Sequence, residues 1–169
     1  MGDKSAFCWE AEVRLVHGAA GEVRAGASAA ETASLSAGLT SKCPDIQAVI
    51  DKHNEYRAAH HAPPLYWSES LAHAAQSWAD KGELQQSETE CGENLALGVD
   101  SCATAVDMWY EERSGYKGEF SPSSCHFSQL VWKGSRQVGC GCNAEQRLVV
   151  CNYLPPGNVK EEFDANVER

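Results

Sequence analysis

The chain is short of basic side chains and of long apolar runs, and each shortage excludes a class of protein. It has 14 Lys and Arg residues against 24 Asp and Glu, which gives a formal net charge of −10 at pH 7. Nucleic acids and anionic membrane surfaces both attract Lys and Arg, so this balance disfavours them as partners. No stretch is long and apolar enough to cross a bilayer, so we expect no transmembrane segment.

Residues 1–42 lack a sustained apolar period and are rich in Ala, Gly, Ser and Glu. Such a composition predicts a flexible leader with little structure. The segment also lacks the continuous apolar stretch of a signal peptide. Ala6 stands where a myristoylation signal needs Ser or Thr, which disfavours lipidation. Residues 43–169 are long enough to form one domain with its own core.

Cysteine is abundant, and it points to an oxidising compartment. Six of the eight cysteines lie between Cys91 and Cys151. An even number clustered in this way is typical of a disulfide framework in a secreted protein. No two CxxC pairs stand at zinc-finger spacing, which disfavours a structural metal. We therefore predict secretion, although residues 1–42 show no signal peptide, and the spacing leaves the pairing open.

Helical periodicity begins just after Pro44, with apolar residues at helical spacing from Ile46. Ser68 and Ser101 are suitable N-caps for a second and a third helix. A short fourth helix is predicted over residues 125–132. Strands are predicted over Gln137–Cys142 and Leu148–Tyr153, and the run of apolar residues in the second implies burial on both faces. Helices on both faces of such a sheet make an α+β protein, a three-layer α-β-α sandwich. In the first strand, Gly139 and Gly141 leave room for a close neighbour.

One carboxylate of the third helix follows its apolar stripe. The stripe runs through Ala105, Met108 and Trp109, and its next position is Glu112, whereas Glu111 lies off it. An inward carboxylate would be unusual. The alternative, which the residues alone favour, is that the stripe ends here and Glu112 lies at its solvent margin.

Four motifs stand in a fixed order at residues 53–57, 92–95, 125–132 and 148–158: HNEYR, GENL, CHFSQLVW and LVVCNYLPPGN. Together they resemble the signature motifs of the CAP superfamily (the SCP/TAPS domain), which includes cysteine-rich secretory, insect venom and plant pathogenesis-related class 1 proteins. The resemblance spans about residues 43 to 159 and implies the α-β-α sandwich. It also implies that Asn54 and Arg57 tie the first helix to the domain.

The resemblance carries further expectations about disulfides and location. It implies one disulfide from near Cys91 to the strand that holds Cys140 and Cys142, and another from that strand to Cys151. It leaves Cys8, Cys43, Cys102 and Cys125 open. Residues 125–158 and the tail 161–167 also resemble the Golgi-associated branch of the family, so an intracellular location is the alternative to secretion.

Family members often gather two His and two Glu in a cleft that can hold a divalent cation. The resemblance assigns Glu93, Glu112 and His126 to this cleft, but Gln86 stands where the fourth ligand, a histidine, is expected. An amide oxygen suits hard cations better than zinc. We therefore expect Gln86 to donate a hydrogen bond to Glu93 or Glu112 in a polar cluster that requires no cofactor. Glu93, Glu112 and His126 would bind Mg²⁺ or Ca²⁺ weakly at most, and tight Zn²⁺ binding is disfavoured.

Catalytic motifs are missing from the chain. GxSxG, HExxH, P-loop and dinucleotide-binding patterns do not occur. Ser128 stands two residues from His126, but residues at this spacing do not face each other on a helix. We expect no enzyme. The alternative is a divalent-metal-dependent hydrolase or protease that uses Glu93, Glu112 and His126.

Relatives in the superfamily are reported to bind sterols, fatty acids or phospholipids, and the resemblance assigns this role to a loop before the His-Phe-Ser-Gln motif or to a groove between helices. Here the loop is residues 114–124, with Tyr116 and Phe120 spaced along it. Aromatic rings on a mobile loop suit a rigid apolar ligand. The alternative is a surface loop whose rings fold onto the core. The sequence thus predicts a secreted, non-enzymatic protein that binds a lipid (sterol or fatty acid) or a partner protein, with a defence or host-interaction role implied by the resemblance.

Overall fold

The computed structural model describes residues 41–169, so most of the predicted leader, and Cys8 with it, lies outside the described residues. Helices and strands follow the chain in this order: α1 Ile46–Ala59, β1 Tyr66–Trp67, α2 Glu69–Ala79, β2 Gly92–Leu97, α3 Cys102–Glu111, the 3₁₀ helix η1 Glu112–Gly115, α4 Cys125–Leu130, β3 Gln137–Asn143, β4 Leu148–Leu154 and α5 Phe163–Asn166. In the described part of the chain, no helix is long and apolar enough to cross a membrane.

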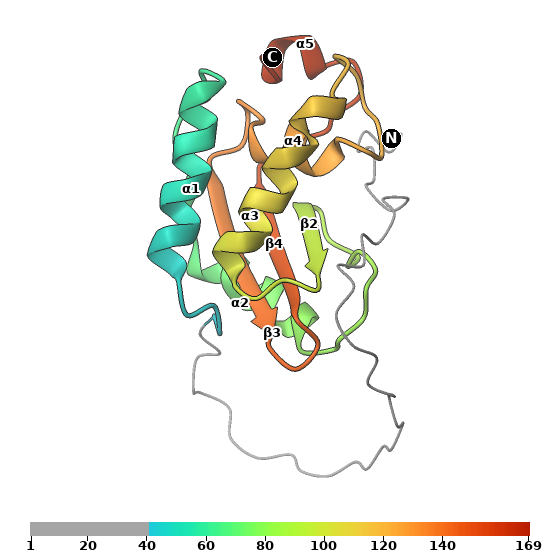
Figure 1. Cartoon of the computed structure of the whole chain (residues 1–169). Coiled ribbons are helices and arrows are strands. Elements are labelled where there is room, and N and C mark those ends of the chain that lie inside the picture. Colours follow the sequence, from blue (N-terminus) through green and yellow to red (C-terminus); the bar gives the residue numbers. More distant parts are fainter. Residues whose placement is uncertain (1–40) are drawn as a thin grey trace.

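The four strands form one sheet in the order β1-β3-β4-β2. Strand β4 pairs antiparallel with β3 and with β2, whereas β1 runs parallel to β3. Figure 1 shows α3 and α4 in front of the sheet and α2 behind it. One apolar cluster lies between the sheet and α1, α3 and α4, and a smaller one lies between the sheet and α2. The predicted three-layer sandwich is confirmed.

Helix α2 lies very close to β3 because the strand has two glycines there. A Cβ atom at Gly139 would come within 2.2 Å of the Ala72 nitrogen, and one at Gly141 within 2.3 Å of the Gln76 Cα. Buried Gln76 then joins the layers, since its amide donates to the Cys142 carbonyl at 2.8 Å and accepts from the Cys142 N–H at 3.0 Å. The close approach predicted at these glycines is therefore confirmed.

Helix α1 is tied to the domain by the two polar residues that the first motif indicated. Asn54 exchanges two hydrogen bonds with the backbone of Leu65. The guanidinium of Arg57 is fully buried, and burial lowers its pKa to about 10. It donates to four backbone carbonyls, those of Pro63, Leu130, Trp132 and Ser135.

The predicted helix starts are confirmed by side-chain caps. Ser68 Oγ accepts from the Leu71 N–H at 3.4 Å, and Ser101 Oγ accepts from the Thr104 N–H at 3.1 Å. Helix α4 ends at Leu130, two residues before the predicted end, and each strand of the β3–β4 hairpin is one residue longer than predicted.

The disulfides confirm one expectation and overturn another. Cys140 is bonded to Cys151 across the β3–β4 hairpin, as expected, and Cys43 is bonded to Cys102. The expected link from Cys91 is wrong, because both Cys91 and Cys142 are free thiols. Gly92, next to Cys91, lies in β2 and pairs with Tyr153 of β4. Cys142 lies in β3, on the opposite edge of β4, and pairs with Val149, four residues from Tyr153. That offset is roughly 13 Å along the strand alone, and a disulfide needs Cα atoms within about 7 Å.

Candidate functional site

The best-defined polar contact of the predicted cleft joins Glu112 to His126. Glu112 caps the end of α3, and His126 lies in the first turn of α4. The carboxylate Oε1 is 2.7 Å from His126 Nδ1, and its Oε2 accepts the backbone N–H groups of His126 and Phe127 at 3.1 and 3.3 Å. Glu112 thus faces α4 from the end of the apolar stripe, with 22% of its side chain exposed, whereas Glu111 points to solvent.

His126 is held in a fixed orientation. Its side chain is 11% exposed and stacks against Trp109, with ring centroids 6.3 Å apart. Because Nδ1 lies at hydrogen-bond distance from a carboxylate oxygen, which can only accept, we assign a ring proton to Nδ1. The ring is therefore oriented much as a carboxylate orients a catalytic or metal-binding histidine.

Glu93 is held separately, by Ser87. Its buried carboxylate accepts from the Ser87 N–H at 2.7 Å and from the Ser87 hydroxyl at 2.6 Å. Burial raises the pKa of Glu93, and the two bonds from Ser87 oppose that rise. Gln86 donates to the backbone carbonyl of Glu93 at 3.3 Å and not to the carboxylate of Glu93 or Glu112. The expected Gln86 hydrogen bond therefore goes to a different atom, and Ser87, which sequence reasoning missed, holds the side chain instead.

Strand β2 directs Glu93 and the next residue, Asn94, to opposite faces of the sheet. Asn94 pairs with Cys151 and donates to the His126 carbonyl at 3.1 Å, so it lies on the α3–α4 face. Glu93 pairs with Asn152, whose other partner Gly139 packs on α2. Since side chains alternate along a strand, Glu93 is directed toward the α2 face. The structure brings Glu112 and His126 into contact and leaves the Glu93 carboxylate on Ser87.

The donor atoms of Glu93, Glu112 and His126 do not form a preformed metal site. Within residues 41–169, the one set of three ligating side chains whose donor atoms all lie within 4.8 Å of one another consists of cysteines. The carboxylates of Glu93 and Glu112 already accept two and three contacts from the protein. A tetrahedral zinc site needs donors that converge on one point, so this arrangement does not fit one.

Ser128 is occupied by a structural role. It is buried, and its hydroxyl lies 2.6 Å from Asn158 Oδ1 and 3.1 Å from the Cys125 carbonyl. Gln129 next to it accepts from the Gly157 N–H at 2.7 Å. These contacts join the third motif to the end of the fourth, which explains why the chain carries both. The hydrogen bonds of the Ser128 hydroxyl thus go to Cys125 and Asn158.

A buried chain of hydrogen bonds links the first motif to this region. His53 Nε2 lies 2.9 Å from the Tyr153 hydroxyl, which accepts from Asn94 at 3.3 Å. Burial lowers the pKa of His53 to about 4 and raises the pKa of Tyr153 far above its ordinary value. Both groups are therefore neutral at physiological pH and serve to hold α1, β4 and β2 together.

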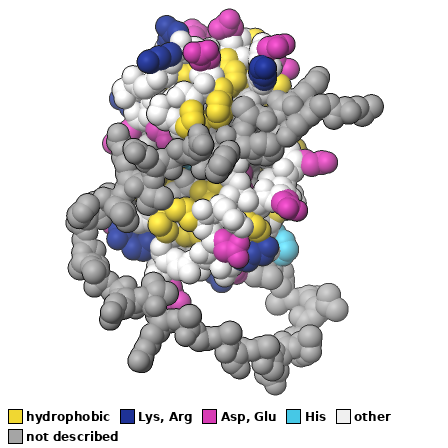
Figure 2. Space-filling model, turned by 90° about the vertical axis from the view of Figure 1, so that its right-hand side faces the viewer, with side chains coloured by type: hydrophobic (Ala, Val, Ile, Leu, Met, Phe, Trp, Pro, Cys, Tyr) yellow, Lys and Arg dark blue, Asp and Glu magenta, His cyan; other side chains and the backbone are white. Residues whose placement is uncertain are grey.

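The predicted lipid loop has its aromatic rings turned inward. Tyr116 is buried and meets Phe127 edge-on at 5.6 Å between centroids, and Phe120 meets Phe163 edge-on at 6.4 Å. The Tyr116 hydroxyl is buried without a hydrogen-bond partner in the described part of the chain. Burial raises its pKa, as does the nearby Asp164. The space-filling view shows a strip of apolar side chains among charged ones at the end of the molecule that holds α4 and α5 (Figure 2).

Comparisons with known proteins agree with this architecture. The sequence profile of the CAP, or Cysteine-rich secretory protein, family matches residues 50–153. The chain is 36% identical over 133 residues to Pathogenesis-related protein 1A of Nicotiana tabacum, which covers 69% of this chain and 78% of the tobacco protein. The chain therefore belongs to the CAP family.

Two fungal relatives are longer. Protein PRY2 of Saccharomyces cerevisiae is 42% identical over 131 residues, which covers 70% of this chain and 40% of PRY2. Secreted protein RBT4 of Candida albicans is 40% identical over 126 residues, which covers 67% of this chain and 35% of RBT4. The chain thus spans less than half the length of these two relatives.

Solved structures support the fold. A crystal structure of NaASP2 with Zn²⁺ superposes with a TM-score of 0.59 at 21% identity, and it covers 70% of this chain and 86% of that protein. Venom allergen-like protein 4 of Schistosoma mansoni gives a TM-score of 0.56 at 23% identity, over 75% of this chain and 94% of that protein. At these identities the likeness concerns the fold alone.

Proposed function

We propose that the chain is a secreted, non-catalytic CAP protein that binds an apolar ligand with one polar end, a sterol or a fatty acid, beneath loop 114–124. The observation that carries the proposal is the buried Tyr116 hydroxyl, which lacks a partner within residues 41–169. A buried polar group without a partner costs about 1–3 kcal/mol. The hydroxyl of a sterol or the carboxylate of a fatty acid would remove that cost by pairing with Tyr116.

The surroundings of Tyr116 suit the rest of such a ligand. If the loop lifted, it would uncover the rings of Phe127 and Phe163, against which Tyr116 and Phe120 now pack. Aromatic faces and edges pack well against a flat, rigid ring system. Gly118, at a φ of 101°, gives the loop a backbone conformation that other residues rarely adopt. The side chain of Arg169 donates to the Lys117 carbonyl, and opening would break this contact.

A binding assay with a radiolabelled sterol and a radiolabelled fatty acid tests the proposal. We expect saturable binding that Tyr116→Phe weakens by about five- to tenfold, since the variant keeps the ring and loses the hydroxyl. Tyr66→Phe is the matched control, because the Tyr66 side chain is 67% exposed. Binding at background level, even at high protein concentration, would remove the lipid proposal and favour a partner protein instead.

The non-catalytic part of the proposal is supported by how the polar side chains are used. Ser128 is engaged by Asn158, and Glu93 is engaged by Ser87. A metal-dependent hydrolase would need Glu93 to leave Ser87 and join Glu112 and His126 around an ion. Calorimetric titration of the native chain and of Gln86→His distinguishes the two. We expect Mg²⁺ and Ca²⁺ to bind weakly at most, and tight Zn²⁺ binding by the native chain would contradict the proposal.

Secretion is supported by the disulfides and by relatives whose names describe them as secreted proteins. Counting reactive thiols in the native protein tests it. We expect Cys140 and Cys151 to resist alkylation before reduction, and at most one of Cys43 and Cys102 to react. Rapid alkylation of all four would instead support the intracellular alternative.

A further inference from the structure

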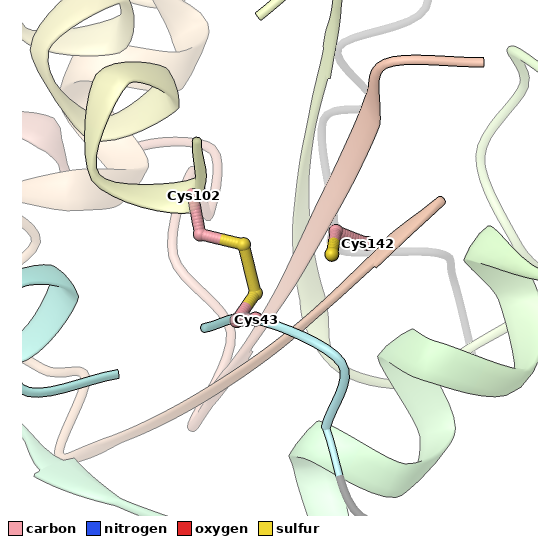
Figure 3. A group of neighbouring side chains, drawn as sticks. All are labelled: Cys43, Cys102 and Cys142. Carbon is pink, nitrogen blue, oxygen red and sulfur yellow. A yellow bond between two sulfur atoms is a disulfide. The ribbon is translucent and has the colours of Figure 1, made fainter. Parts of the chain in front are cut away.

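Three cysteine sulfurs meet where the segment before α1, the start of α3 and the end of β3 come together. Cys43 and Cys102 form a disulfide, and the thiol of Cys142 lies beside it (Figure 3). All three sulfurs lie within 4.8 Å of one another. A metal bound here would need several thiolate ligands. Because Cys43 and Cys102 are bonded to each other, only Cys142 could supply one. The geometry therefore favours chemistry between a thiol and a disulfide.

We propose that Cys142 exchanges with the Cys43–Cys102 disulfide. The Cys142 thiolate attacks Sγ of Cys43, a Cys43–Cys142 bond forms, and the Cys43–Cys102 bond breaks. Cys102 leaves as a thiolate and takes up the proton that Cys142 lost. One disulfide replaces another, so the step is redox-neutral and needs no external oxidant or reductant. The chain then has two disulfide isomers.

The backbone already holds Cys43 beside Cys142. Gln76 Oε1 accepts from the N–H groups of both Lys42 and Cys142, at 2.8 and 3.0 Å. Ser41 Oγ donates to the Cys140 carbonyl at 2.7 Å and accepts from the Cys43 N–H at 3.1 Å. Residues 41–43 are thus fastened along β3, which keeps the Cys43 sulfur within 4.8 Å of the Cys142 sulfur.

We take Cys102 as the leaving group because it begins α3, where the helix dipole counters the negative charge of the Asp45 carboxylate, which accepts from the Ala103 N–H at 2.9 Å. It is the first residue of this ten-residue helix, directly after the N-cap Ser101. The N-terminus of a helix stabilises a thiolate, and a thiol of lower pKa leaves faster in exchange. Exchange would also remove the covalent link between the start of α3 and the segment before α1, leaving the hydrogen bond from the Ala103 N–H to Asp45 at 2.9 Å, and it would link that segment covalently to β3.

The surroundings of Cys142 make exchange faster at higher pH. Burial raises the pKa of its thiol, and so does Asp45, just before α1. Asp80 at the end of α2 acts in the same direction, and Lys42 opposes it. Below that pKa the thiolate fraction rises about tenfold per pH unit, and the rate of exchange should rise with it.

Disulfide mapping of the full chain tests the proposal. Cys91→Ser removes the other free thiol of residues 41–169. The protein is then incubated without reductant at pH 7 and at about pH 9, with iodoacetamide to trap thiols. We expect alkylated Cys102 and a Cys43–Cys142 peptide, both forming faster at the higher pH, and neither in the double variant with Cys142→Ser. Alkylation of Cys142 alone, with Cys43–Cys102 intact at both pH values, would overturn the proposal.

A second variant does not depend on the rate of exchange. Cys102→Ser leaves Cys43 and Cys142 without the competing sulfur, and mild oxidation should join them. Circular dichroism checks that the variant is folded. If folded Cys102→Ser kept both cysteines open to alkylation after oxidation, the two sulfurs would not be placed for exchange and the proposal would fail.

Discussion

His53 makes the stability of the fold depend on pH. Its ordinary pKa is 6.5, and burial lowers the pKa to about 4 in the folded chain. The unfolded chain therefore takes up a proton as the pH falls through 6.5, whereas the folded chain does so only near 4. The stability that neutral His53 contributes is complete above pH 6.5 and is lost as the pH falls toward 4.

We expect the free energy of unfolding to fall by about 3 kcal/mol between pH 7 and pH 4 through this residue. Urea unfolding at the two pH values measures the fall. His53→Gln should be less stable at pH 7 and lose less on acidification, while His73→Gln, at an exposed position, should behave as the native chain does. An unchanged pH dependence in His53→Gln would contradict this role.

Single residues of the candidate site differ in how far the sequence could reveal them. The helical period of α3 reached Glu112, but the residues alone favoured a solvent-margin position, and the family resemblance assigned Glu112 to the cleft. The structure places its carboxylate 2.7 Å from His126. Ser87 gave no comparable signal, because it lies in an irregular segment where no period relates it to Glu93. Its role depends on how residues 80–91 fold back onto β2, which is decided by tertiary contacts.

At the scale of elements, the close packing of α2 on β3 requires two glycines, Gly139 and Gly141. A Cβ at Gly141 would lie 2.3 Å from a backbone atom of α2, so neither element could avoid it by rotating a side chain. We expect Gly141→Ala to lower the free energy of unfolding by about 3 kcal/mol. Gly115→Ala is the control, since its nearest new contact would be at 3.7 Å. Equal stabilities of the two variants in urea would show that the layers are not packed this tightly.

The elements with a long period or a clear cap were predictable, and those without were not. Ser68 and Ser101 mark helix starts by their own chemistry, so α2 and α3 begin where predicted. The two residues of β1, Tyr66 and Trp67, are too few to show a period, and this strand was missed. The Cys91 link failed for another reason: which cysteines meet is set by the register of β4 against its two neighbours, which no single segment encodes.

The whole molecule is acidic, and this bears on how it would meet lipid. A net charge of −10 repels anionic headgroups, so the proposed ligand is a single lipid molecule and not a membrane surface. We expect little of the chain to sediment with phosphatidylserine vesicles, and the bound fraction should not increase when the salt concentration is lowered. Strong, salt-sensitive sedimentation would contradict this and point to a local basic surface.

The most direct test of the proposed function is photo-crosslinking with a photoactivatable sterol, followed by peptide mapping of the labelled chain. If the ligand lies beneath loop 114–124, the label should fall on that loop or on Phe127 and Phe163, and unlabelled sterol should compete it away. Label that falls elsewhere, or that excess unlabelled sterol does not reduce, would contradict a sterol site beneath this loop.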